Sequence, residues 1–143
     1  IWTPIITLSL RQDYVFTLKK LFMAVKRGDT FGVLKICGET WFLRYVDEPD
    51  PNGSGRTALH WATRRGYTTQ AAILVESGAE SRVKDATGWN AMHYAARYGH
   101  RQIVKNLLGS PHGEELCNQK DAIGNTPVTC QLYFTCLLAL YIP

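Results

Sequence analysis

Histidine and cysteine are the residue types in this chain that could ligate a metal ion or move a proton near neutral pH. The sequence has four of each. Cys37, Cys117, Cys130 and Cys136 form no Cys-x-x-Cys pair, and no histidine stands at zinc-ligand spacing from any of them. We therefore interpret them as four separate thiols, which is typical of a reducing, intracellular compartment. We expect no metal site and no cofactor.

Catalysis would need a nucleophile beside a base, a pair of carboxylates, or a glycine-rich phosphate loop that opens a helix after a strand. Gly53-Ser54-Gly55 is the glycine-rich candidate, but it lacks the lysine of a phosphate-binding loop. It also precedes Thr57, a residue type that caps helices, so we interpret it as a turn. The sequence thus predicts neither an enzyme nor a site for a small-molecule substrate.

The composition is that of an ordinary globular domain, because 45% of the 143 residues are hydrophobic and 20% are charged. The net charge of +4 suits an acidic partner. Nucleic acid is disfavoured as a partner, since the basic residues are spread along the chain without a dense run. Residues 122–143 contain no charged side chain, and this stretch approaches the length that spans a membrane.

The segments that position the histidines repeat along the chain. Residues 52–67 superpose on residues 85–100 without a gap, at a period of 33 residues. Asp121 begins a third copy 36 residues after Asp85, and we expect the three extra residues in a loop at residues 110–115. Asn52 and Asp85, each followed three residues later by glycine, predict the hairpin turns.

Each copy is predicted to contain two helices. Thr57 and Asn90 are typical of the residue that caps the start of a helix. Gly66 follows the first helix, where a left-handed residue ends a helix without steric cost. Residues 70–75 and 103–108 then carry apolar side chains at helical spacing. One such unit cannot bury its own apolar face, so stability depends on the stacking of three to four units.

These copies resemble the ankyrin repeat, whose pattern is Asp-x-x-Gly-x-Thr-Pro-Leu-His-x-Ala-Ala-x-x-Gly-His followed by an apolar helix. Residues 19–37 resemble a degenerate first repeat, with residues 24–28 in the place of residues 62–66. The resemblance implies an all-α solenoid of stacked helix pairs with short hairpin loops. It also implies that His60 and His93 are structural imidazoles that bond adjacent loop backbone.

The predicted organisation has three parts. Residues 1–17 are an N-terminal extension and a candidate capping helix, residues 18–128 are the ankyrin-repeat domain, and residues 129–143 are a divergent apolar segment. The pattern is lost after Val128, where Thr129 replaces the histidine of the family. Three interpretations of the last segment stay open: the irregular end of a truncated or alternatively ended chain, a membrane-inserting segment, and a divergent capping repeat.

Ankyrin-like solenoids resemble one another in holding protein partners on a concave surface, made of the hairpin tips and the first helices. Non-framework positions of that surface carry residue types enriched at interface hot spots. We expect the partner-binding residues to be Arg56, Trp61, Trp89, Tyr94, Ser54 and Thr87. Packing over the neighbouring hairpins is the alternative for the aromatic side chains. Four further cations form either an electropositive rim or a solvated face: Arg64, Arg65, Arg97 and Arg101.

The sequence therefore predicts a protein-binding or scaffolding module, cytoplasmic or nuclear, whose protein partner could be acidic. One alternative is the regulatory arm of a larger enzyme, or of a membrane channel or transferase, with the C-terminal segment leading towards a membrane. A second is a nucleic-acid-associated module, for which affinity would fall steeply as salt rises.

Overall fold

The computed structural model describes the backbone of residues 3–127 and the side chains from residue 12 onward. Within that range every regular element is a helix, which confirms the predicted all-α class. The elements are α1 (Thr3–Arg27), α2 (Thr30–Cys37), the 3-10 helix η1 (Leu43–Tyr45), α3 (Ala58–Arg65), α4 (Thr68–Glu76), α5 (Ala91–Arg97), α6 (Arg101–Leu108) and α7 (Gly113–Asn118).

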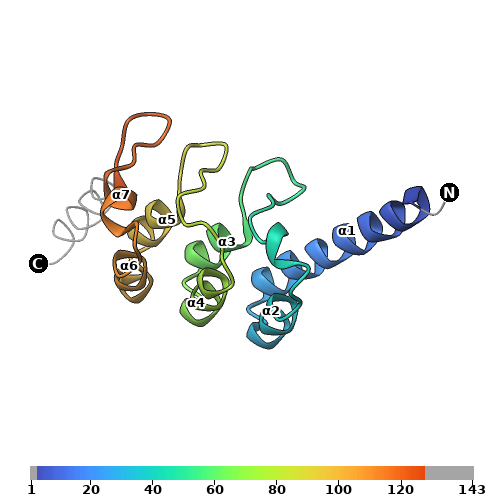
Figure 1. The fold of residues 1–143 in the computed structure, drawn as a ribbon. Helices are drawn as coiled ribbons and strands as arrows, with labels where there is room; N and C mark the ends of the chain where they lie inside the picture. The colour runs from blue at the N-terminus through green and yellow to red at the C-terminus, as the bar shows by residue number, and fades with distance from the viewer. Residues whose placement is uncertain (1–2, 128–143) are drawn as a thin grey trace, which may run out of the picture.

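The helices stack in two rows, as Figure 1 shows. One row contains α1, α3 and α5, and the other contains α2, α4 and α6; neighbours within each row are in contact, and so are the two helices of each pair. The loops that connect consecutive pairs all project from the same side of the stack (Figure 1). This arrangement is a solenoid in which each helix pair packs on the next.

Local sequence explains where the helices start and stop. Asp29 caps α2, because its Oδ1 accepts a hydrogen bond from the Gly32 amide at 2.9 Å. Gly66 ends α3 with a φ of 75°, in the left-handed region. A Cβ atom at Gly66 would also lie 2.5 Å from the His100 ring, so both the backbone angle and the space require glycine.

Small and aliphatic side chains form the contacts between repeats. Ala62 and Ala95 have no exposed surface, and Ala91 is 1% exposed, which lets the backbones of successive first helices approach closely. Leu74 and Ile103 fill the space between the second helices and are at most 1% exposed. Burial of each such aliphatic side chain contributes about 1.5–3 kcal/mol, so stacking of the repeats stabilises the fold.

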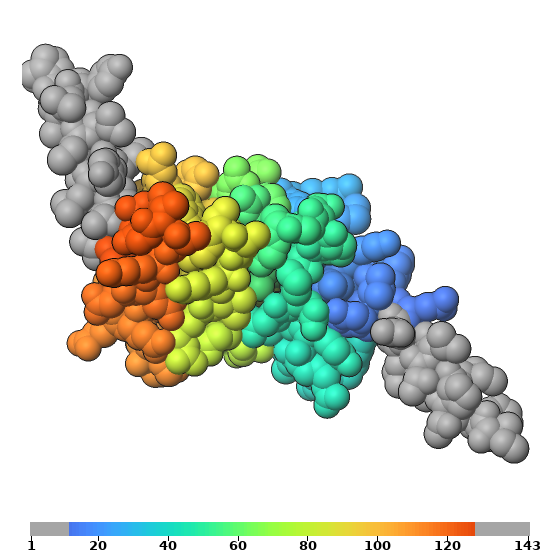
Figure 2. Space-filling view, turned by 90° about the horizontal axis from the view of Figure 1, so that it is seen from above, coloured from blue at the N-terminus to red at the C-terminus, as the bar shows by residue number. Residues whose placement is uncertain are grey.

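The hairpins are joined to one another by backbone hydrogen bonds. The Ala86 amide donates to the Ser54 carbonyl at 3.1 Å, and the Ala122 amide donates to the Thr87 carbonyl at 3.2 Å. Gly88 lies at this contact, where a Cβ atom would approach the Ala122 nitrogen to 2.6 Å. The hairpins therefore lie side by side across one face of the molecule, which Figure 2 shows from above.

The register expected for the first hairpin is wrong. The repeat pattern pairs Asn52 with Asp85, but the backbone of Asp50 takes that place: its amide donates to the Arg56 carbonyl at 2.7 Å, as the Asp85 amide donates to the Trp89 carbonyl at 2.9 Å. The first hairpin contains two more residues than the second between these partners. Asn52 lies within the longer turn, and its amide donates to Asp50 Oδ1 at 3.3 Å.

The loop expected at residues 110–115 is also partly wrong, because α7 begins there and continues to Asn118. Leu116 on α7 has no exposed surface and anchors the helix to the core. Glu114 and Glu115 lie in the first turn, where carboxylates interact favourably with the helix dipole.

The helix α1 continues through the expected boundary between residues 17 and 18. Tyr14, in the proposed N-terminal extension, lies against Tyr45 with ring centroids 4.4 Å apart, and Leu18 is buried. None of the helices between residues 3 and 127 is long and apolar enough to cross a membrane. The predicted apolar segment at residues 129–143 lies outside the described residues.

Candidate functional site

Asp85 organises the junction between the second hairpin and α5. Its Oδ1 accepts hydrogen bonds from the Thr87 amide at 2.9 Å, the Thr87 hydroxyl at 2.6 Å and the Trp89 amide at 3.0 Å. Its Oδ2 accepts from the Tyr94 hydroxyl. Burial disfavours ionisation of this carboxyl, but the four hydrogen bonds more than offset that cost and hold its pKa below the usual range. Asp85 is therefore a buried carboxylate that fixes the side chains around it.

Tyr94 is only 3% exposed, so its ring packs within the solenoid, as the packing alternative for the aromatic side chains expects. Its hydroxyl donates to Asp85 and accepts a 2.8 Å hydrogen bond from Arg56 Nε. Burial and the hydrogen bond to the Asp85 carboxylate raise the pKa of Tyr94 to about 12, so the phenol stays protonated. The role that this geometry gives Tyr94 is to hold the Arg56 guanidinium in place, rather than to present an exposed ring.

Arg56 and Trp61 form a cationic cluster with Lys26 and Arg64. The Trp61 ring centroid lies 4.6 Å from Lys26 Nζ, 5.3 Å from the Arg56 Cζ and 5.4 Å from the Arg64 Cζ. Such cation–π contacts contribute about 0.5–1 kcal/mol each where they are exposed to solvent. Arg56 and Trp61 are both half-buried, so part of each side chain packs on the solenoid and part faces solvent.

Trp89 combines a packing contact with partial exposure. Its indole N–H donates to Asp121 Oδ2 at 3.0 Å, which ties the second hairpin to the third. Its ring meets the Tyr94 ring edge-on, with centroids 5.1 Å apart. The alternative interpretation of the aromatics, packing over neighbouring hairpins, therefore describes part of the Trp89 side chain.

A groove of about 520 Å³ lies where the second and third hairpins meet the ends of α3 and α5. We call it the hairpin groove and define it by its lining residues: Arg56, Arg64, Thr87, Trp89, Tyr94, Tyr98, Asp121, Ala122, Ile123 and Asn125. Four of the six predicted site residues line it. Trp61 lies beside it, in contact with two of its arginines.

Ser54 does not line the groove. Its hydroxyl oxygen is buried without a hydrogen-bond partner, while its carbonyl binds the next hairpin. Sequence reasoning missed Tyr98, which follows Tyr94 by four residues and stacks parallel to it at 6.5 Å. That spacing places two side chains on one face of a helix and was the signal available.

The four arginines considered as a rim have different environments. Arg65, Arg97 and Arg101 are exposed. Arg64 is half-buried, and its Cζ lies 5.4 Å from the Trp61 ring centroid and 5.9 Å from that of Tyr98. Arg64 thus belongs to the groove rather than to a separate rim.

The histidines have the structural role that the resemblance implied. His60 Nδ1 accepts from the Thr57 amide at 2.9 Å, so Nε2 carries the proton and donates to the Val83 and Trp89 carbonyls at 3.0 and 3.1 Å. His93 Nδ1 likewise accepts from the Asn90 amide at 3.2 Å. Burial lowers the pKa of both imidazoles, which favours the neutral form that these contacts require.

The structure describes two of the four cysteines, and both are free thiols. Burial raises the pKa of Cys37 and of Cys117, which disfavours the reactive thiolate. In the part of the chain between residues 12 and 127, no three histidine, cysteine or acidic side chains come together as metal ligands would.

Comparison with known proteins identifies the family of the chain. The profile described as ankyrin repeats (3 copies) matches residues 21–128, and the chain belongs to this family. It is 33% identical over 75 residues to protein phosphatase 1 regulatory subunit 12A of Mus musculus, a match that covers 51% of this chain and 7% of that protein.

Two further relatives are similar over comparable stretches. Notch-regulated ankyrin repeat-containing protein B of Danio rerio is 41% identical over 54 residues, which cover 38% of this chain and 49% of the relative. Ankyrin repeat and SAM domain-containing protein 6 of Mus musculus is 33% identical over 90 residues, which cover 58% and 10%. The chain thus matches less than half the length of each of these three relatives.

Proposed function

We propose that this ankyrin-repeat module binds a partner protein through the hairpin groove. The observation that carries the proposal is the position of Arg64. Its Cζ lies 5.4 Å from the Trp61 ring centroid and 5.9 Å from that of Tyr98, and it has no ion-pair partner among the side chains of residues 12–127. A carboxylate of the partner would complete this site, and a net charge of +4 would attract an acidic segment.

The other groove residues supply apolar contact area and a rigidly held cation. Trp89 offers a partly exposed aromatic surface, and Ile123 is 83% exposed at the edge of the groove. Arg56 is held by Tyr94 and Asp85, so little side-chain entropy is lost when a partner binds it. Aromatic and arginine side chains on a rigid support are the types that dominate the energy of protein interfaces. Trp61 and Thr87 complete the proposed surface, and Ser54 supports it through the hydrogen bond that its carbonyl accepts from the Ala86 amide.

The test is affinity capture from cell extract with the double variant Arg56→Ala/Trp89→Ala. We expect it to lose the proteins that the parent chain retains, while its helical circular-dichroism signal is unchanged. The matched control is Arg101→Ala/Leu108→Ala on α6, where both side chains are exposed and far from the hairpins in sequence. The proposal fails if every captured protein binds the double variant as well as it binds the control.

The compartment is part of the same proposal. Cys37 and Cys117 are free. We infer that the module works in a reducing, intracellular compartment, where unpaired cysteines are the rule.

A further inference from the structure

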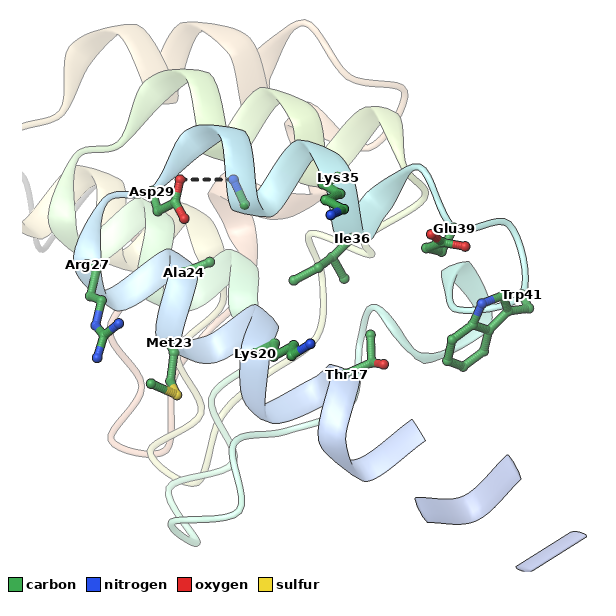
Figure 3. Close-up of a pocket in the computed structure, with 11 residues that line it drawn as sticks. Thr17, Lys20, Met23, Ala24, Arg27, Asp29, Lys35, Ile36, Glu39 and Trp41 are labelled. Carbon is green, nitrogen blue, oxygen red and sulfur yellow. Dashed lines mark hydrogen bonds between the residues drawn. The ribbon is translucent and has the colours of Figure 1, made fainter. Parts of the chain in front are cut away.

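A second hollow lies at the opposite end of the stack, on the outer face of α1 and α2. It measures about 530 Å³ and is shown in Figure 3. We call it the end-face hollow and define it by its lining residues: Thr17, Lys20, Met23, Ala24, Arg27, Asp29, Gly32, Lys35, Ile36, Glu39 and Trp41. Met23 is 49% exposed and Trp41 is 43% exposed, so the hollow offers apolar surface to solvent.

The same face of the later repeats packs against helices. Gly28, Gly66 and Gly99 follow the first helices of the three pairs. Counted eight residues back from these glycines, Lys20 occupies the position of Ala58 and Ala91. Those alanines are at most 1% exposed, and their helices α3 and α5 each pack on the first helix of the preceding pair. On α1 the corresponding face, which includes Lys20, is exposed to solvent instead.

Two features distinguish the end face from an ordinary contact between repeats. Lys20 stands where the later repeats have a buried alanine, and close stacking of another repeat there would bury its charge. The helix α1 also contains 17 residues before Lys20. It is therefore helical at the positions where, in the later repeats, a hairpin leads into α3 or α5. In Figure 1 this part of α1 runs away from the stack instead of turning back over it.

The charges of the hollow are unbalanced. Lys20, Arg27 and Lys35 line it, and none of them forms an ion pair within residues 12–127. Of the two acidic residues in the hollow, Asp29 is already engaged as the cap of α2. In Figure 3 the side chains of Lys20 and Lys35 lie on either side of Ile36, so two cations flank an apolar floor.

We propose that the end-face hollow docks an acidic amphipathic helix of a partner protein. The apolar side of the helix would cover Met23, Ile36 and Trp41, and its carboxylates would pair with Lys20 and Lys35, the helix-in-groove mode of recognition. A second copy of this chain fits less well. Among the helices of residues 3–127, only α7 carries two acidic residues, Glu114 and Glu115, and it is a six-residue helix whose leucine is fully buried.

The probe is a fluorescent peptide of about 15 residues, long enough to form a helix, with a leucine stripe flanked by glutamates. A second peptide with lysines in place of the glutamates is its control. We expect the acidic peptide to bind with saturation and to shift the amide resonances of α1 and α2, while the basic peptide does not bind. The inference is overturned if the acidic peptide fails to bind at about 1 mM or binds no better than the basic one.

Charge reversal separates the end face from the rest of the surface. Lys20→Glu/Lys35→Glu should weaken binding of the acidic peptide roughly tenfold or more, since two attractive charge pairs become repulsive. The control Arg101→Glu/Lys105→Glu makes the same change of net charge on α6 and should change the affinity less than about twofold at moderate salt. Equal losses in both variants would show that only net charge matters, and the inference would fall.

Two further measurements distinguish other occupants and the proposed function. Sedimentation that reveals a dimer, lost in Lys20→Glu/Lys35→Glu, would identify a second copy of the chain as the occupant and overturn the inference. So would binding to phosphatidylserine vesicles without binding to the acidic peptide. The hairpin-groove variant Arg56→Ala/Trp89→Ala should bind the peptide normally, so that failure of one surface does not imply failure of the other.

Discussion

Gln70 on α4 has a polar side chain at a buried position, where the next repeat has an apolar one. It is 1% exposed, and neither its amide oxygen nor its amide nitrogen has a hydrogen-bond partner among the described residues. The equivalent residue of the next repeat, 33 residues later, is Ile103, which is also 1% exposed. An unsatisfied amide in such a site costs about 1–3 kcal/mol.

Gln70→Met removes both polar atoms while it keeps an unbranched chain of similar length and nearly the same helix propensity. We expect the variant to be about 1–2 kcal/mol more stable than the parent chain, which raises the melting temperature by about 3–8 °C. The measurement is urea unfolding followed by circular dichroism at 222 nm, with melting temperature as a second readout.

The matched control is Gln102→Met on α6, an exposed site whose amide bonds Asn106. Its stability should change by no more than about 0.5 kcal/mol. A Gln70→Met variant less stable than the parent would refute the reasoning, because it would mean that the amide of Gln70 is satisfied within the folded chain.

Three further predictions concern the hairpins and their supports. Asp85→Asn should cost about 2–3 kcal/mol in urea unfolding, since hydrogen bonds to a carboxylate are the strong ones. The variant should also lose less stability in acid than the parent chain. A carboxyl whose pKa is lowered in the folded chain stabilises the fold at a pH above its unfolded pKa of about 3.9, and this contribution is lost as the pH falls through the folded pKa. Because the pKa values of His60 and His93 are lowered in the folded chain, the free energy of unfolding should be highest above about pH 6.5 and should decline below it. Urea unfolding at pH 7.5 and 5.5 measures this decline, which should be smaller in His60→Gln. Gly88→Ala should lower the free energy of unfolding by about 2–4 kcal/mol, and Gly53→Ala by about 1 kcal/mol. The φ angle is positive at both glycines, but of the two only Gly88 has a backbone atom close to the position of the added Cβ, so equal shifts in melting temperature would contradict this.

The repeat itself could be predicted because it depends on residues that are close to one another in the sequence. Capping residues, the glycines after the first helices and the apolar spacing of the second helices act over a few residues each, and their repetition at 33 residues made them recognisable. The role of His60 and His93 followed from their shared position in the pattern. These features need no knowledge of which side chains meet in space.

The candidate site depended on contacts that local patterns do not encode. Tyr94 is next to His93 in the sequence, and nothing local indicates that Asp85 and Arg56 would both bind its hydroxyl. The first hairpin misled the alignment, because Asn52 has the same turn chemistry as the residue that holds the fold, Asp50. The end-face hollow was not predicted, since it depends on how far α1 extends beyond the first repeat.

The histidine contacts have a consequence for where this chain can be divided. His60 on α3 holds the carbonyls of Val83 and Trp89, and His93 on α5 lies 3.2 Å from the carbonyl of Asn125. Each imidazole thus secures a hairpin that the sequence pattern assigns to the following repeat. The contacts of each imidazole therefore extend one hairpin beyond the repeating unit. A fragment cut just before Asp121 would lose the acceptor of His93, whereas a fragment that ends after Asn125 would keep it.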